Sequence, residues 1–263
     1  MGNKLPAVLI TGASSGIGAV YADRFAKRGH DLVLVARDKG RLETLADRLR
    51  TEAGVKVDVL PADLAVRADL ARVEQRLQED QSIGVLVNNA GIAAPGTFAN
   101  ADVDVVDRLI QVNVTAVTRL VAAVVPRFLA RKAGAIVNIA SVLGLAPELS
   151  LGVYGASKAF VLTLSQSLQV ELGGQGIYVQ AVLPAATRTE IWQRSGRDVN
   201  AIAGMMDVDE LVDAALVGFD RREPVTIPPL PDAGQWDTFD AARKAMLPNF
   251  RNERAAQRYR TVA

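Results

Sequence analysis

Residues 7–18 have the sequence AVLITGASSGIG, in which a short apolar run leads directly into a glycine-rich loop. A helical pattern of apolar residues follows the loop, and a strand that turns into a helix in this way aims free backbone N–H groups at an anion, usually a pyrophosphate. Gly12 would permit the tight turn, Gly16 the approach of a phosphate, and Gly18 the close packing of helix on sheet. A merely flexible turn is the alternative. The position of the loop at the first strand–helix junction favours a nucleotide site.

The same alternation of short apolar runs and longer amphipathic segments continues along the chain. The runs are β-branched and almost continuously apolar, as expected for strands that are covered on both faces. Repeated strand–helix alternation implies βαβ units. We therefore expect an α/β fold of the Rossmann type, doubly wound, with a mostly parallel seven-stranded sheet and helices on both faces. The predicted strands are 7–11, 31–36, 56–61, 85–88, 135–140, 178–183 and 225–227.

A proline-rich segment at 228–231 ends the pattern of strands, because prolines remove hydrogen-bond donors from a sheet. We predict that residues 1–231 form one dinucleotide-binding catalytic domain and that 232–263 form a C-terminal helical tail. The tail would carry an apolar stripe that must pack on its own domain or on a neighbouring subunit. The stripe consists of Trp236, Phe239 and Met246.

Composition excludes several classes of function. The 263 residues carry 30 basic and 29 acidic side chains, so there is no polybasic surface for a nucleic acid. The absence of cysteine excludes disulfides, cysteine-bound zinc and thiol nucleophiles. The one histidine, His30, excludes multi-histidine metal sites and is expected in a surface turn. Neither a signal peptide nor a run of about 18 apolar residues is evident, and we expect a cytoplasmic protein without a membrane segment.

Three polar side chains are placed where they could act together. Tyr154 and Lys158 are four residues apart in a predicted helix and share one face. Ser141 follows the fifth strand, at the sheet edge where open α/β folds bind ligands. A tyrosine with a pKa of about 10 is a poor base at neutral pH, but a neighbouring ammonium would favour the phenolate. Each residue alone is an ordinary anchor or surface group, whereas the combination indicates an active site.

The glycine spacing is G-x3-G-x-G and departs from the usual dinucleotide pattern G-x-G-x-x-G. Together with Asn88-Asn89-Ala90-Gly91, Ser141 and the Tyr154/Lys158 pair, it resembles the short-chain dehydrogenase/reductase family, in its compact single-domain type, over about residues 5–230. The resemblance implies that Tyr154 protonates a carbonyl oxygen as hydride arrives from a nicotinamide. Ser141 would hold that oxygen, and Lys158 would also bind the nicotinamide ribose. The positive charge of an oxidised nicotinamide would help the Lys158 ammonium to favour the phenolate. Asn113 would hold water in the proton path, although a tolerated polar residue in a helix is the alternative.

The resemblance also implies cofactor contacts along the chain. Asp63 matches a position that binds the adenine amino group, although it could instead cap the next helix, and Asn88 would tie strands together. After the sixth strand the family commonly has Pro-Gly, whereas this chain has Pro184-Ala185, which narrows the backbone freedom there. The expected cofactor-binding residues are Gly12, Ser14, Ser15, Gly16, Ile17, Gly18, Arg37, Asp63, Leu64, Asn89, Ala90, Gly91, Tyr154, Lys158, Pro184, Thr187 and Thr189.

The end of the second strand predicts which dinucleotide is used. Sites that prefer NAD usually place a carboxylate there, but this chain has Ala36 followed by Arg37. Without a carboxylate at this position a 2′-phosphate is not repelled, and the Arg37 guanidinium can bind that phosphate. If Asp38 reached the ribose instead, the preference would reverse. We expect NADP(H) to be preferred over NAD(H).

The leading hypothesis is an NADP(H)-dependent oxidoreductase that interconverts a ketone or aldehyde and its alcohol, with Tyr154 as general acid/base. The alternative is a catalytically silent NADPH-binding sensor on the same fold. A serine hydrolase is excluded, because Ser141 lacks a G-x-S-x-G elbow. The family implies a homo-oligomer and a segment at about 188–210 that closes the substrate pocket. Apolar residues of that segment favour an apolar, small-molecule substrate: Ile191, Trp192, Ile202, Met205 and Met206.

Overall fold

One parallel sheet organises the larger part of the molecule. The computed structural model describes residues 5–93, 98–149, 152–194 and 204–260, and these contain seven strands in the order β3-β2-β1-β4-β5-β6-β7. Every neighbouring pair among them is parallel. The predicted Rossmann-type sheet is thereby confirmed. The strands are β1 (Ala7–Thr11), β2 (Leu32–Ala36), β3 (Val57–Pro61), β4 (Ile83–Asn88), β5 (Gly134–Ile139), β6 (Ile177–Val182) and β7 (Val225–Thr226).

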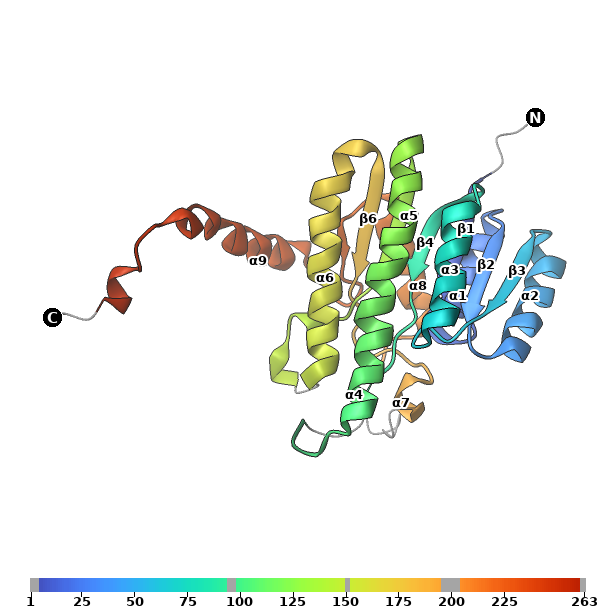
Figure 1. Ribbon diagram of the computed structural model, residues 1–263, viewed down its shortest axis with the longest axis horizontal. Coiled ribbons are helices and arrows are strands. Elements are labelled where there is room, and N and C mark those ends of the chain that lie inside the picture. The colour runs from blue at the N-terminus through green and yellow to red at the C-terminus, as the bar shows by residue number, and fades with distance from the viewer. Residues whose placement is uncertain (1–4, 94–97, 150–151, 195–203, 261–263) are drawn as a thin grey trace. The chain divides into compact units, whose positions relative to one another are not determined.

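Helices cover both faces of this sheet (Figure 1). On one face α1 (Gly16–Lys27), α2 (Lys39–Ala53) and α8 (Val208–Asp220) share an apolar core with the sheet. On the other face α3 (Arg67–Glu79), α5 (Val117–Arg131) and α6 (Gly152–Leu172) enclose a second core. Side chains of a strand alternate between the two faces. In β1, accordingly, Ile10 belongs to the first core and Leu9 to the second.

The order of the strands determines where a ligand can bind. The chain starts in the middle of the sheet at β1, moves outward to β3, and returns through β4 to build the other half. The loops that follow β1 and β4 therefore leave the sheet in opposite directions. They open a crevice at the carboxyl ends of these two strands, which is where doubly wound folds bind ligands.

One long helical segment contains an irregular turn. α4 (Val103–Ile110) continues through a π-helical turn at Gln111–Ala116 into α5. Among the described residues, Val103–Arg131 is the one helix long and apolar enough to cross a membrane, and half of its most apolar window is buried inside the molecule. Phe128 and Val124 are fully buried between α5 and the sheet. Such burial is typical of a core helix in a globular domain.

The C-terminal residues form a separate unit, Leu230–Ala263. It contains α9 (Ala233–Ala245), which begins at Asp232, whose side chain accepts a hydrogen bond of 2.8 Å from the Gly234 N–H. The rings of Trp236 and Phe239 lie 5.6 Å apart on one side of α9. None of the residues of α9 is buried. The partner of the predicted apolar stripe thus stays a prediction.

Candidate active site

The glycine loop between β1 and α1 is held against the end of β4. Gly12 adopts a φ of 67°, and a Cβ atom there would lie 2.8 Å from the Asn89 Nδ2 atom. A Cβ atom on Gly18 would collide with the Gly12 carbonyl oxygen. The two glycines are therefore required by close packing within the loop. No side chain caps α1, so the backbone N–H groups of its first turn are left for another acceptor.

Hydrogen bonds from β1 join this loop to the segment after β4. The Thr11 Oγ1 atom accepts bonds of 3.0 Å from the backbone N–H groups of Asn89 and Ala90. The Asn89 side chain in turn donates to the Thr11 and Gly12 carbonyl oxygens, at 2.9 and 3.2 Å. Asn89 lines the cavity, but its amide N–H groups already bind the loop. The sequence interpretation missed Thr11, whose only signal was a hydroxyl at the end of an apolar strand.

Asn88, the preceding residue, connects strands as the sequence interpretation expected. Its Nδ2 atom donates to the Asn138 Oδ1 atom of β5 at 2.9 Å. The Asn138 Nδ2 atom continues the chain to the Ser165 hydroxyl of α6, also at 2.9 Å. These three side chains are buried. They link β4, β5 and α6, the elements around which the polar residues of the site are arranged.

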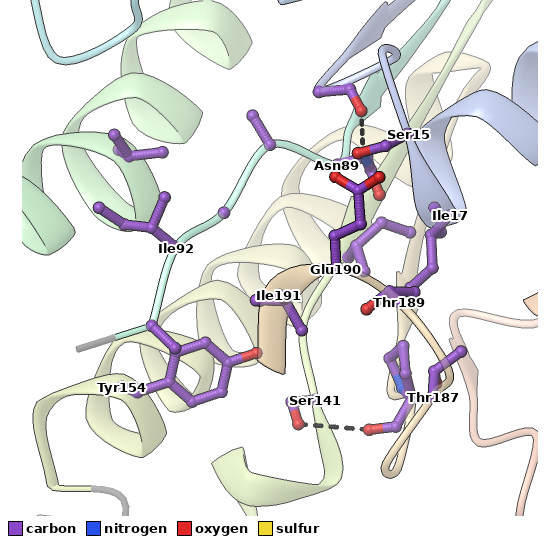
Figure 2. Close-up of a pocket in the computed structure, with 18 of the residues that line it drawn as sticks. Ser15, Ile17, Asn89, Ile92, Ser141, Tyr154, Thr187, Thr189, Glu190 and Ile191 are labelled. Carbon is purple, nitrogen blue, oxygen red and sulfur yellow. Dashed lines mark hydrogen bonds between the residues drawn. The ribbon is translucent and has the colours of Figure 1, made fainter. Parts of the chain in front are cut away.

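Ser141, Tyr154 and Lys158 line the same cavity, and Figure 2 shows Ser141 and Tyr154 in the lower part of the view. Ser141 follows β5, and its hydroxyl donates to the Pro184 carbonyl oxygen at 3.2 Å. Tyr154 and Lys158 come from successive turns of α6. The Lys158 Nζ atom donates to the Ile139 carbonyl oxygen at 2.8 Å and lies 5.6 Å from the centre of the Tyr154 ring. The predicted juxtaposition of a hydroxyl, a phenol and an ammonium is present.

Burial is the main cause of the pKa shifts of Tyr154 and Lys158. Removal from water raises the pKa of Tyr154 to about 12, although a hydrogen bond with Ser141 opposes the rise. The same removal from water lowers the pKa of Lys158 to about 8. Among the groups of this chain, burial therefore favours the neutral phenol, and the phenolate expected beside an oxidised nicotinamide stays a prediction. At neutral pH Tyr154 is a neutral phenol and can donate a proton.

Asn113 lies in the π-helical turn with its side chain buried. Its Oδ1 atom accepts from the Ile92 N–H, and its Nδ2 atom donates to the Ile92 carbonyl oxygen, both at 2.9 Å. Nδ2 also donates to the Ser157 hydroxyl at 3.1 Å. Asn113 thus clamps the segment after β4 to α6. A water bound to it stays a prediction, and the amide groups seen here are used within the protein.

The other end of the cavity carries the charged residues expected near adenosine. Asp38 turns its carboxylate to the start of α2, where it accepts a 3.0 Å bond from the Arg41 N–H. Asp63 accepts from the Ala65 N–H at 3.0 Å and forms a 2.5 Å ion pair with Arg108. Among the described residues, no hydrogen bond or ion pair engages the side chain of Arg37. Arg108 also lines the cavity and was missed, since it lies in an ordinary amphipathic helix of the sequence.

The segment after β6 forms a further wall of the cavity. Thr187 is buried and forms a parallel β-bridge with Met206. This bridge joins the two ends of the segment. Ala185 is not among the described residues with positive φ, so the missing glycine leaves no strain there. The short helix α7 (Ile191–Arg194) follows, and the Trp192 indole donates to the Thr187 carbonyl oxygen at 2.7 Å. Residues 195–203 of the predicted substrate segment, Ile202 included, lie outside the described residues.

These walls enclose a cavity of about 1060 Å³. It is lined by every predicted site residue except Gly18 and Asn113, which support the loop and the segment behind it. In the described part of the chain, no cluster of acidic and histidine side chains could hold a metal ion. His30 lies in a turn, where its ring contacts the Pro6 carbonyl oxygen at 2.7 Å.

Comparison with known proteins agrees with this geometry. Residues 6–200 match the family model described as short chain dehydrogenase. The chain is a short-chain dehydrogenase/reductase. It is 38% identical over 187 residues to a very-long-chain 3-oxoacyl-CoA reductase of Anas platyrhynchos, a match that covers 70% of this chain and 60% of that relative. The chain therefore spans less than two thirds of the length of this relative.

Two solved structures match nearly the whole chain. One is a short-chain dehydrogenase from Sphingobium yanoikuyae in complex with NADPH, 64% identical, with a TM-score of 0.96 over 97% of this chain and 100% of that one. The other is a bulky-bulky ketone specific alcohol dehydrogenase from Comamonas testosteroni. It is 56% identical, with a TM-score of 0.92 over 98% of this chain and 100% of that one.

The lowered pKa of Lys158 makes the stability of the fold depend on pH. Between about pH 8 and pH 10.5 the folded protein has released the Lys158 proton, whereas the unfolded chain retains it, so stability rises with pH through this window. The variant Lys158→Met lacks this gain. From pH 7 to pH 10 we expect the wild type to gain roughly 1–3 kcal/mol over the variant, measured by urea unfolding.

Lys39→Met, which alters an exposed lysine at the start of α2, is the control and should follow the wild type at both pH values. A constant difference between the wild type and Lys158→Met from pH 7 to pH 10 would contradict the assigned burial effect.

Proposed function

We propose that this short-chain dehydrogenase/reductase is an NADPH-dependent carbonyl reductase that also oxidises the corresponding alcohol. The observation that carries the proposal is the convergence of Ser141, Tyr154 and Lys158 at one end of a single cavity whose other end holds Arg37. The uncapped start of α1 lies between these ends and suits a diphosphate. When bound, the cofactor supplies the hydride; the protein supplies binding and the proton.

The residues of the chain support each part of this reaction. The Ser141 and Tyr154 hydroxyls can both donate to a carbonyl oxygen placed between them, and two donors stabilise the negative charge that develops there. Because the phenol is neutral at pH 7, Tyr154 can transfer its proton to that oxygen. Lys158, held by the Ile139 carbonyl oxygen, can stabilise the resulting phenolate and bind a ribose hydroxyl. In alcohol oxidation the same proton returns to Tyr154.

The substrate end of the cavity is apolar. Side chains around Tyr154 and Ser141 come from the segment after β4, from the turn after β5 and from α7; they are Ile92, Val142, Leu143, Leu149, Ile191 and Trp192. Such walls favour a ketone that carries large apolar groups. The specificity for bulky-bulky ketones in the name of the Comamonas protein supports the same class of substrate for this chain.

The charged groups at the adenosine end favour NADPH over NADH. Asp38 directs its carboxylate to the Arg41 N–H, so it is occupied as a helix cap. Arg37 lines the cavity without an ion-pair partner among the described residues and can bind a 2′-phosphate. The NADPH complex of the Sphingobium protein supports this assignment.

A direct assay tests the proposal against the alternative of a silent NADPH-binding sensor. The purified chain is given NADPH and a panel of ketones that ranges from acetone to diaryl ketones, and NADPH consumption is followed by absorbance. We expect turnover to be highest with the bulky apolar ketones. NADPH binding without turnover on any member of the panel would favour the sensor.

Tyr154→Phe removes the transferred proton and leaves the cofactor site intact. We expect kcat to fall by several orders of magnitude while the Kd for NADPH changes little, because proton transfer and oxyanion stabilisation are both lost. Ser141→Ala should cost about 10²–10³ in kcat, as the loss of one donor. Steady-state kinetics and NADPH fluorescence titration measure the two effects. Turnover of Tyr154→Phe near that of the wild type would rule out the assigned acid.

Arg37→Ala tests the assignment of the 2′-phosphate subsite. We expect it to weaken NADPH binding by about 1.5–3 kcal/mol, the usual contribution of a hydrogen bond to a charged group, with little change for NADH. The kcat/KM values for both cofactors measure the effect. Equal values for NADPH and NADH in the wild type would contradict the assignment.

We further propose that the protein forms a homo-oligomer to which the C-terminal unit contributes. Phe239 and Met246 each expose about half of their surface, at 49%, although a helix as short as α9 is marginally stable by itself in water. An apolar stripe on such a helix requires a partner, either the catalytic domain or another subunit.

Truncation after Pro231 tests this role of the C-terminal unit. We expect the truncated chain to have a lower thermal midpoint or a smaller oligomer by light scattering, because the apolar stripe loses its partner. The circular dichroism spectrum should retain the α/β signal. An unchanged midpoint together with an unchanged oligomer would show that the stripe has no packing role.

A further inference from the structure

An ion pair joins α2, which begins beside the cavity residue Asp38, to the cavity residue Glu190. The Arg41 Nη1 atom, in the first turn of α2, donates to both carboxylate oxygens of Glu190, at 2.9 and 2.8 Å. The two residues are 149 positions apart. Arg41 follows the residues expected to bind adenosine, whereas Glu190 directly precedes α7, which lines the substrate end. The pair therefore connects the cofactor side of the site to the substrate side.

Glu190 lies near the glycine loop, where the diphosphate of a dinucleotide is expected to bind. Glu190 lines the cavity together with Asp38 and the glycine loop, and Figure 2 shows its side chain on the side of the view where Ser15 lies. The neighbouring Thr189 lies close to the loop, since a Cβ atom on Gly16 would be 3.1 Å from the Thr189 Cγ2 atom. On the other wall the Asp38 carboxylate is 3.5 Å from the Arg41 Nε atom.

A dinucleotide that reached from Arg37 to Tyr154 in this cavity would run beside both the glycine loop and the segment of Thr189 and Glu190, since all of these line it. We propose that the Arg41–Glu190 pair is a clasp that closes over the bound cofactor and slows its release. Arg41 and Glu190 are then positioning residues for the dinucleotide. The inference rests on the proposed function only in requiring that NADPH binds this cavity.

Simple electrostatics would give Glu190 the opposite effect. A carboxylate beside the path of a diphosphate repels it, so that its removal should tighten NADPH binding. In a clasp, the same removal frees the segment before α7, and the cofactor leaves faster. The sign of the effect of Glu190→Gln thus separates the two roles. Because exposed ion pairs contribute little, the expected change in the release rate is about two- to fivefold.

The experiment measures NADPH release by stopped-flow fluorescence with excess NADP⁺ as competitor. The variants are Arg41→Met, Glu190→Gln and the double variant. We expect each single variant to release NADPH about two to five times faster than the wild type. The double variant should be no faster than the faster single variant, because one interaction is lost in all three. NADH release should accelerate by the same factor, since the clasp does not recognise the 2′-phosphate.

Arg28→Met is the matched control. It breaks another exposed pair between distant segments, in which Arg28, directly after α1, binds Asp220 of α8 through two bonds of 2.9 Å, away from the cavity. Its release rate should equal that of the wild type. Unchanged or slower release in Glu190→Gln, additive effects in the double variant, or acceleration in the control would each overturn the clasp while leaving the proposed function intact. Failure of the wild type to bind NADPH would overturn both.

Discussion

The close approach of the β1 loop to the end of β4 is the constraint on which the site depends. Thr11 and Asn89 exchange hydrogen bonds across this junction, and only glycine fits at Gly12 and Gly18. The two strands are neighbours because the strand order reverses between them. The junction presents the start of α1 to the crevice, and the Asn88–Asn138 bond extends the same support toward Ser141.

Burial prepares the reacting groups and sets their charge. A phenol held neutral by desolvation is a proton donor, and an ammonium whose pKa falls to about 8 is poised to respond to a bound anion. Both effects disfavour the charged forms, and an opposite charge brought close to either group would oppose them. The cost of keeping Lys158 buried is offset by its bond to the Ile139 carbonyl oxygen, which also aims it at the cavity.

The helical segment that carries Asn113 shows how local irregularity serves the site. The π-helical turn at Gln111–Ala116 rotates the helix relative to a regular one, and such turns often occur at functional sites. Here the turn allows one side chain to bind both backbone groups of Ile92 and the Ser157 hydroxyl. The wall after β4 is thereby fixed to α6, one residue before Lys158.

The sequence by itself determined the parallel sheet, the glycine loop and the Ser141, Tyr154 and Lys158 group, because these depend on local periodicity and on the ends of strands. It did not reveal the partners of Arg108 and Glu190, which lie 45 and 149 residues away from them. It also did not show how strongly burial raises the pKa of Tyr154, since a pKa depends on how deeply the group is buried. Long-range pairing and desolvation arise only when the chain is packed, and these were decided by the tertiary structure.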